Sequence, residues 1–330
     1  MVSSGNMEKT VFLHIGMPKT GSTAIQSALR NYDDGKIKYA DFSYDNHSRP
    51  MFTAFSPVDE SHLDWRNRGY SASEIQVERE RYRKRLSSIL SCNDREGIVI
   101  SAEMLGALRS PDKIELIDFI KEHGWRPIIV CYVRSPLSLA PSLFSELVKH
   151  RLGSVPSKLS PNYREALEIF STLVSPSDIR VRSFDSKKLF DGNVVKDFCK
   201  LIGANGRISG EISENASLSS DAVRLLFNFN RSGVLSSGDP LTDKAHWMLV
   251  KVLERIYVNT EKLSPSLFES LADYSETDWL KNNFGIDFRS QPARSREPSL
   301  QSKLDNLADV GLGPIDRALE EFELKPDKFQ

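Results

Sequence analysis

The chain has 330 residues, 39% hydrophobic and 27% charged, which is enough for one large α/β domain with a packed core. Its formal net charge of −1 excludes a generally basic nucleic-acid-binding protein, so any anion site must be built locally. No stretch reaches the roughly 18 consecutive apolar residues of a transmembrane helix. Residues 1–10 lack the apolar region of a signal peptide. We expect a flexible N-terminal segment over residues 1–10 and a cytoplasmic protein.

Short apolar runs alternate with helical patterns along the first two thirds of the chain. The apolar runs predict buried strands over 11–15, 97–101, 127–133 and 179–184. Helical spacing predicts helices over 24–30, 72–91, 111–123, 136–150 and 193–202. Ser110 is expected to cap the third of these helices, and residues 33–66 are expected to be loop. The alternation predicts an α/β fold with a parallel β-sheet flanked by helices.

Strand patterns fade beyond residue 206, and the remaining chain is expected to be mostly helical. Helices are predicted over 219–233 and 243–257, and an exposed loop over 289–302. We therefore expect an α/β core over 11–206 and a helical C-terminal part of the same domain over 207–330. The three cysteines, Cys92, Cys131 and Cys199, form no CxxC pair and are expected to be free thiols.

A glycine-rich loop between the first predicted strand and helix has the composition of an oxyanion site. Its sequence is Gly16-Met17-Pro18-Lys19-Thr20-Gly21-Ser22-Thr23. Glycines let the backbone curl around an anion, the helix start adds partial positive charge, and Lys19 adds a full charge. In the Walker A pattern GxxxxGK[ST] a lysine follows the second glycine, whereas here Ser22 follows Gly21. The loop therefore predicts an oxyanion cradle that differs from that of a nucleoside triphosphatase.

The segment Pro18–Thr23 resembles the 5′-phosphosulfate loop of sulfotransferases that use 3′-phosphoadenosine 5′-phosphosulfate (PAPS). The resemblance implies that Lys19 contacts the bridging oxygen of the leaving group. It also implies that the rest of the loop holds the 5′-phosphate; these residues are Pro18, Thr20, Gly21, Ser22 and Thr23.

A second motif lies more than 100 residues further along the chain. Arg134 follows the strand 127–133, and Ser142 comes eight residues later on the next predicted helix. This spacing resembles that of the arginine and serine with which the same family binds the 3′-phosphate. An arginine suits this role because its planar guanidinium can donate two parallel hydrogen bonds to phosphate.

The resemblance covers roughly residues 11–225. Over this range the chain is similar to bacterial, carbohydrate-sulfotransferase-like members of the P-loop superfamily. The resemblance implies transfer of a sulfuryl group from PAPS to an acceptor hydroxyl, with 3′,5′-ADP (PAP) as product. A saccharide or glycolipid is the preferred acceptor, and a small alcohol or phenol stays open. No metal is implied, and the six histidines show no metal-ligand spacing. The C-terminal RKGxxG element of the steroid and phenol enzymes is not visible, so the adenine pocket stays unassigned.

Sulfuryl transfer needs a base that takes the proton of the acceptor hydroxyl. His47 is the first candidate, because carbohydrate sulfotransferases often place their base in this loop region and histidine titrates near neutral pH. Glu103, just past the strand 97–101, is the second, because the carboxyl edge of a parallel sheet faces the ligand. His14, inside the first strand, is expected to be a core residue. Gln26, on the first helix, is a weaker candidate for contact with the donor or Glu103.

Two other functions stay open at this point. A P-loop kinase or NTPase with a degenerate loop would need a magnesium-binding carboxylate at a strand end, and only Glu103 offers one. A non-catalytic nucleotide-binding module would keep the donor site and lack the base. Aromatic residues between 33 and 70 suit sugar stacking as well as ordinary packing; they are Tyr39, Phe42, Tyr44, Phe52, Phe55, Trp65 and Tyr70.

Overall fold

The structure is a computed structural model that describes residues 9–57, 65, 69–92, 94–205, 218–234, 240–257, 261–288, 299–308 and 310. The chain divides into two compact units. The first comprises Met1–Ser135, Asn162–Glu214 and Ser275–Phe288, and the second comprises Pro136–Pro161, Asn215–Tyr274 and Arg289–Gln330. The predicted division at residue 206 stays a prediction. The segment 1–8 of the expected flexible N-terminus lies outside the described residues.

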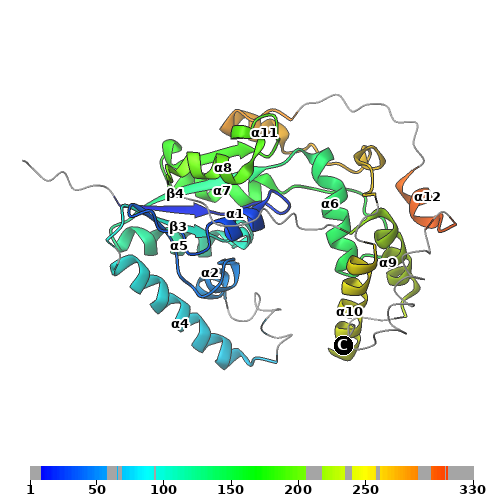
Figure 1. The fold of residues 1–330 in the computed structure, drawn as a ribbon, viewed down its shortest axis with the longest axis horizontal. Helices are drawn as coiled ribbons and strands as arrows, with labels where there is room; N and C mark the ends of the chain where they lie inside the picture. Colours follow the sequence, from blue (N-terminus) through cyan, green and yellow to red (C-terminus); the bar gives the residue numbers. More distant parts are fainter. Residues whose placement is uncertain are drawn as a thin grey trace, which may run out of the picture. The chain divides into compact units, whose positions relative to one another are not determined.

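The first unit is built on a five-stranded parallel sheet, which confirms the predicted fold class (Figure 1). Its strands are β1 (Thr10–His14), β2 (Ile37–Tyr39), β3 (Gly97–Ser101), β4 (Arg126–Val133) and β5 (Ile179–Ser183). The order is β2-β3-β1-β4-β5, so β1 lies at the centre. Val11 of β1 is in register with Ile98 of β3 and Pro127 of β4. The four predicted strands are confirmed within a residue or so at each end.

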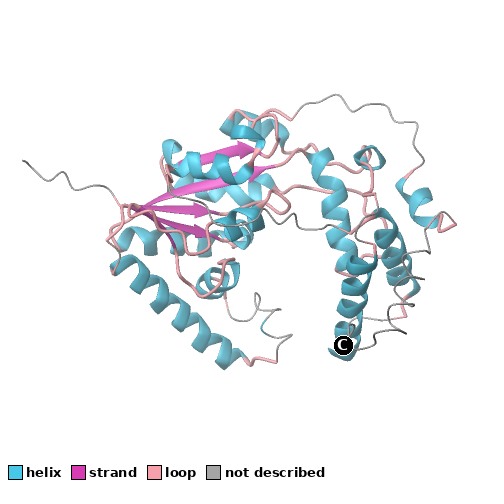
Figure 2. Cartoon of the chain, in the orientation of Figure 1, coloured by secondary structure: helices cyan, strands magenta, loops and turns pink. Residues whose placement is uncertain are grey.

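Helices cover both faces of this sheet because alternate strand residues point to opposite sides (Figure 2). Phe12 and Val130 pack with α1 (Ser22–Ala28) and α8 (Val194–Ile202). Leu13 and Ile129 belong to the core on the other face. That face is covered by α2 (Ser48–Phe55), α4 (Ala72–Ser91), α5 (Ser110–Glu122), α7 (Tyr163–Leu173) and α11 (Thr277–Phe284). The predicted helix 72–91 matches α4, which begins with a capping box between Ser71 and Glu74.

Three local predictions are wrong. The stretch 33–66, expected to be loop, contains both β2 and α2. Strand β2 has only three residues and α2 only eight, so neither is long enough to display the usual pattern of its type. Ser110 does not cap α5: Arg109 is the N-cap residue, and Ser110 is already helical. Within the expected loop 289–302, residues 300–302 begin α12 (Leu300–Asp305), and residues 289–298 lie outside the described residues.

The described part of the second unit is helical. It comprises α6 (Pro136–Lys149), α9 (Ser220–Ser232), α10 (Pro240–Ile256) and α12, with a short 3-10 turn, η4 (Pro265–Phe268). Phe144 of α6 is the centre of an aromatic cluster, with its ring 5.9 Å from Phe227 and 5.6 Å from Phe268. None of the helices in the described ranges is both long and apolar enough to cross a membrane. The three cysteines are free thiols, as predicted.

Candidate functional site

The glycine-rich loop lies at the centre of the first unit's sheet, between the end of β1 and the start of α1. Strands β3 and β2 lie on one side of β1, and β4 and β5 lie on the other. The strand order therefore reverses at β1. In open parallel sheets, ligands bind outside the carboxyl ends of the strands at such a reversal. The position of the loop follows from the topology alone.

Three loop residues adopt left-handed backbone conformations: Gly16 with φ 54°, Lys19 with φ 63° and Gly21 with φ 81°. Left-handed and right-handed residues in succession turn N–H groups toward a common point, which is the geometry of anion-binding nests. A lysine in this conformation costs about 1–2 kcal/mol. Backbone strain of this kind concentrates at ligand sites, so the conformation of Lys19 supports a binding role for the loop.

The two glycines also permit close packing. A Cβ on Gly16 would lie 2.8 Å from Ser22 Oγ and 2.9 Å from Glu103 Cβ. A Cβ on Gly21 would lie 2.9 Å from Val194 Cγ1 and 3.1 Å from the Phe184 ring. Real Cβ atoms essentially never approach other atoms to within 3.0 Å. Glycine is therefore required at Gly16 to bring the loop against the residues that follow β3.

The loop hydroxyls have different environments. Thr20 Oγ1 donates to the Met17 carbonyl at 2.7 Å and accepts from the Met17 N–H at 3.3 Å, so it closes the loop internally. Ser22 Oγ is buried and has no hydrogen-bond partner among the described residues. A buried hydroxyl without a partner costs about 1–3 kcal/mol. An oxyanion held in the loop would remove this cost, which fits the predicted phosphate role. Thr23 is half-buried, and Pro18 is exposed.

Arg134 follows β4 and reaches the loop. Its Nη1 donates to the Lys19 carbonyl at 3.3 Å, across 115 residues of sequence, and its guanidinium lies 5.9 Å from the centre of the Phe184 ring. The Tyr163 hydroxyl donates to the carbonyl of Arg134 at 2.5 Å and so fixes its backbone. Burial lowers the pKa of Arg134, although an arginine keeps its charge at neutral pH. An anion beside it would offset that loss of solvation.

Ser142 lies on α6 and belongs to the second unit, whereas Arg134 and the loop belong to the first. Its predicted contact with the 3′-phosphate therefore stays a prediction. The segment 215–217, part of the resemblance over 11–225, lies outside the described residues.

His47 is a buried residue at the N-terminus of α2. Its main-chain N–H donates to the Ser101 carbonyl at 3.0 Å, and its Nδ1 accepts from the Ser101 N–H at 3.2 Å. The ring lies 4.4 Å from that of Tyr39 and 5.0 Å from that of Phe42. Burial lowers the pKa of His47 to about 4, against the opposing effect of nearby carbonyls and carboxylates. Because Nδ1 accepts a hydrogen bond, the neutral ring carries its proton on Nε2.

Glu103 is the first residue of the 3-10 turn η1 (Glu103–Ala107), which starts just after β3. It is half-buried, and its Cα would lie 3.1 Å from a Cβ on Gly16. The structure thus places Glu103 directly beside the loop. Glu103 and Lys19 are brought to the same sheet edge because β3 and β1 are neighbouring parallel strands.

Two residues beneath the loop form a polar core around Ser101. His14 Nδ1 shares a hydrogen bond of 2.8 Å with Ser101 Oγ, and burial lowers the pKa of His14 to about 3. Gln26 Nε2 donates to the Ser101 carbonyl at 3.4 Å. His14 is therefore a core residue, as expected. Sequence reasoning missed Ser101 and Phe184, although each lies at or just beyond the end of a strand at the sheet edge that carries the loop.

No family model matches the chain, and no curated protein matches it. A comparison with solved structures finds the sulfotransferase domain from the curacin biosynthetic pathway, with 14% sequence identity and a TM-score of 0.32. The match covers 91% of this chain and 96% of that domain. Similarity at this level does not establish donor, acceptor or activity. Within the described ranges, no three histidine, cysteine, aspartate or glutamate side chains are grouped as a metal site would require.

Proposed function

We propose that the protein is a PAPS-dependent sulfotransferase that moves a sulfuryl group to an acceptor hydroxyl. The contact between Arg134 and the Lys19 carbonyl carries this proposal, because it joins the two predicted phosphate motifs at one sheet edge. PAPS carries phosphates at its 3′ and 5′ positions, and the site offers two cationic side chains, Lys19 in the loop and Arg134 after β4. The lysine inside the loop and the arginine after β4 also differ from the usual Walker arrangement.

The loop residues take distinct roles in this proposal. Lys19 neutralises charge that develops on the bridging oxygen as the bond between sulfur and the leaving phosphate breaks. Ser22 and Thr23 donate to the 5′-phosphate, whereas Thr20 holds the loop closed. Arg134 binds the 3′-phosphate, with Ser142 assigned to the same group by the family resemblance. The protein mainly positions the reactants and stabilises charge, since the new sulfur–oxygen bond forms in line with the one that breaks.

We assign the base to Glu103 and keep His47 as the alternative. Glu103 is half-buried beside Gly16, and a carboxylate there accepts the acceptor's proton as the hydroxyl oxygen attacks sulfur. The Nδ1 of His47 is occupied by the Ser101 N–H, and its other nitrogen carries the proton. We expect Glu103→Gln to retain 3′,5′-ADP binding and to lose about 100-fold or more in transfer rate. If His47→Gln loses transfer and Glu103→Gln does not, His47 is the base.

The proposed acceptor is a saccharide or glycolipid hydroxyl, and the proposed location is the cytoplasm. The acceptor class rests on the family resemblance and on the aromatic residues between 33 and 70. Tyr44 and Tyr70 are 41% and 39% exposed, although the Tyr44 ring lies 5.5 Å from the Arg49 guanidinium and the Tyr70 ring lies 4.7 Å from that of Trp65. Transfer of label from radioactive PAPS to a panel of glycans and glycolipids tests the class. Tight 3′,5′-ADP binding without transfer to any hydroxyl compound would support a binding module instead.

Calorimetry separates the sulfotransferase from a P-loop kinase or NTPase. The kinase hypothesis is favoured by one observation: Glu103 follows the strand next to β1, where a magnesium-binding carboxylate would lie. We expect 3′,5′-ADP to bind without magnesium and Lys19→Ala to weaken that binding about 10-fold or more. Lys36→Ala, a change at an exposed lysine of the same unit, is the matched control. Tight binding of ATP with magnesium and none of 3′,5′-ADP would overturn the proposal.

A further inference from the structure

The backbone of Arg134 is held at both of the peptide groups that flank its Cα atom. The carbonyl of Val133, in the peptide group before that atom, accepts from the Phe184 N–H at 2.7 Å. The carbonyl of Arg134 itself, in the peptide group after it, accepts from the Tyr163 hydroxyl at 2.5 Å. Peptide groups are planar, and the φ and ψ angles of a residue orient the two that flank it. The two hydrogen bonds therefore fix the backbone from which the Arg134 side chain extends.

These two hydrogen bonds differ in what they require of the sequence. The first is a main-chain bond that continues the pairing of β4 with β5, in which Val133 is in register with Ser183. Any residue with a main-chain N–H at position 184 would supply it. The second comes from a side chain, that of Tyr163, 29 residues further along the chain. Tyrosine is the amino acid that places a hydroxyl at the far end of a rigid ring, so this anchor depends on the residue at position 163.

The Tyr163 side chain is itself fixed in place. It belongs to the first residue of α7, is 1% exposed, and its ring lies 6.1 Å from that of Phe288. Leu167 and Phe170 of the same helix are buried in the core that covers one face of the sheet. A hydroxyl on a ring held in this way keeps its acceptor in a defined position, and one acceptor is the carbonyl of Arg134.

The guanidinium of Arg134 must be placed accurately because its neighbours lie close on two sides. Its Nη1 donates to the Lys19 carbonyl at 3.3 Å, and the group lies 5.9 Å from the centre of the Phe184 ring. A guanidinium recognises phosphate through a planar fork of hydrogen-bond donors. Binding groups of this kind must be held within about 0.5 Å of the productive geometry. An anchor on the Arg134 backbone therefore bears directly on the binding of an anion.

We propose that Tyr163 is a positioning residue for Arg134 and so sets how strongly the site prefers nucleotides that carry a 3′-phosphate. The hydroxyl of Tyr163 holds the Arg134 carbonyl, and the guanidinium of Arg134 meets the phosphate. This role rests on the proposed function, because it takes Arg134 as the ligand of the 3′-phosphate.

Calorimetry with 3′,5′-ADP and 5′-AMP tests this role in the full-length chain. The two nucleotides differ only in the 3′-phosphate, so the ratio of their affinities measures the recognition of that group. Tyr163→Phe removes the hydroxyl and keeps the ring. We expect it to lower the ratio about fivefold or more and to change the affinity for 5′-AMP less than about twofold. An unchanged ratio, or an equal loss for both nucleotides, would overturn the role of Tyr163.

Tyr132→Phe is the matched control, because it also removes one buried tyrosine hydroxyl. That hydroxyl donates to the Asp197 carboxylate at 2.8 Å, and Tyr132 lies on the same strand as Val133, just before Arg134. We expect this variant to keep the affinity ratio within about twofold of the wild-type value. A loss as large as that of Tyr163→Phe would show that the ratio responds to any buried hydroxyl and would overturn the role of Tyr163.

A double-mutant cycle separates positioning from a general effect on the fold. In an Arg134→Ala background we expect Tyr163→Phe to change the affinity for 3′,5′-ADP less than about twofold, because the hydroxyl acts through the guanidinium. The same loss of about fivefold in both backgrounds would show that Tyr163 acts independently of Arg134 and would overturn its positioning role.

The wild-type protein distinguishes failure of this role from failure of the proposed function. If it binds 3′,5′-ADP no more tightly than 5′-AMP, the proposed function is contradicted, and the role of Tyr163 with it. If it prefers 3′,5′-ADP and Tyr163→Phe retains that preference in full, the role of Tyr163 alone is contradicted.

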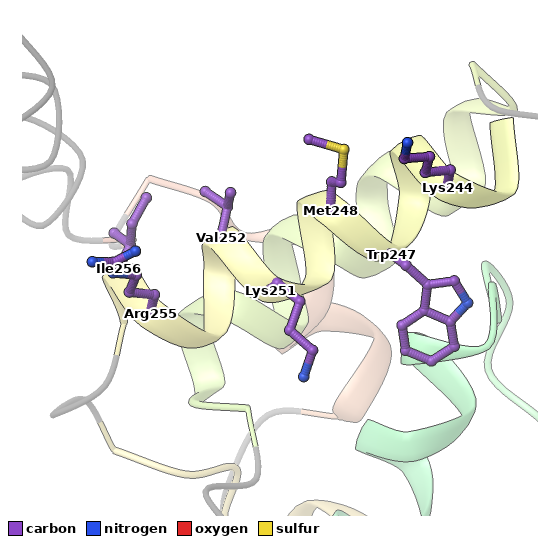
Figure 3. Close-up of a pocket in the computed structure, with 7 residues that line it drawn as sticks. All are labelled: Lys244, Trp247, Met248, Lys251, Val252, Arg255 and Ile256. Atoms are coloured by element: carbon purple, nitrogen blue, oxygen red, sulfur yellow. The ribbon is translucent and has the colours of Figure 1, made fainter. Parts of the chain in front are cut away.

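Cations elsewhere in the chain are tested in the same titrations. Figure 3 shows a hollow of about 540 Å³ on α10, whose lining includes the exposed Lys244 together with Lys251 and Arg255. We expect Lys244→Ala to leave the affinity for 3′,5′-ADP within about twofold of the wild-type value, because an exposed charge outside the binding site contributes little. A loss of about fivefold or more would place the nucleotide at α10 and would overturn the role of Tyr163.

Discussion

Replacing Gly16 with alanine tests how closely the glycine-rich loop packs against the end of β3. The new Cβ would lie 2.9 Å from Glu103 Cβ and 3.1 Å from Glu103 Cα. These atoms belong to or adjoin the backbone, so no side-chain rotation relieves the clash. Gly35 provides the matched control because it also has a left-handed φ, of 87°, and a Cβ added there would meet no atom within 4 Å.

Both substitutions place an alanine in a left-handed conformation, but only the one at Gly16 also introduces a steric clash. A left-handed alanine costs about 1–2 kcal/mol at either position. Overpacking adds about 1–3 kcal/mol at Gly16 alone. We therefore expect the free energy of unfolding to fall by about 2–5 kcal/mol for Gly16→Ala and about 1–2 kcal/mol for Gly35→Ala.

Urea unfolding measures this difference. Tryptophan emission is recorded in a Trp247→Phe background, since the three other tryptophans, Trp65, Trp125 and Trp279, lie in the first unit. An extra loss of about 2 kcal/mol lowers the midpoint by roughly 1 M for an m-value near 2 kcal/mol/M. Equal midpoints for Gly16→Ala and Gly35→Ala would refute the close approach of the loop to Glu103.

Three further predictions concern charge and pH. Arg134→Ala should weaken 3′,5′-ADP binding about 10- to 100-fold by calorimetry, whereas exposed Arg164→Ala should change it less than about twofold; equal effects would exclude a direct role. In the folded state burial lowers the pKa values of His14 and His47 to about 3 and about 4. Below pH 6.5 the unfolded chain therefore binds protons at these two histidines that the folded protein does not bind. The free energy of unfolding should therefore fall as pH drops from 6.5 toward 4, and His47→Gln should flatten that slope by up to about 1.4 kcal/mol per pH unit in urea titrations. Burial raises the pKa of Asp197, but its hydrogen-bond donors outweigh this and hold it below 3.8. Asp197→Asn should thus cost about 1.5–3 kcal/mol at pH 7, a difference that shrinks as pH falls below 3.8; a constant difference down to about pH 2 would contradict the lowered pKa.

Local patterns in the sequence are sufficient for the main elements of the sheet and for the loop. Four strands are predictable because parallel strands buried on both faces are continuous apolar runs. The loop at Gly16–Thr23 is recognisable because glycines, a lysine and hydroxyl residues lie next to one another between a strand and a helix. Strand β2 and helix α2 escape prediction because three residues of strand and eight residues of helix are too short to display a clear period.

The sequence by itself determined the fold class, which the structure confirms, because strand and helix patterns lie in neighbouring residues. It also predicted an oxyanion cradle at Gly16–Thr23, and that role stays a prediction. Only the tertiary structure decided which distant groups meet. Arg134 contacts the Lys19 carbonyl because β4 pairs with β1, and Glu103 lies beside Gly16 because β3 pairs with β1 on the other side. Burial of His47 against Ser101 likewise depends on packing across 54 residues of chain, which no local pattern records. Strand order and burial are properties of the whole fold, and they are what place Glu103 ahead of His47 as the proposed base.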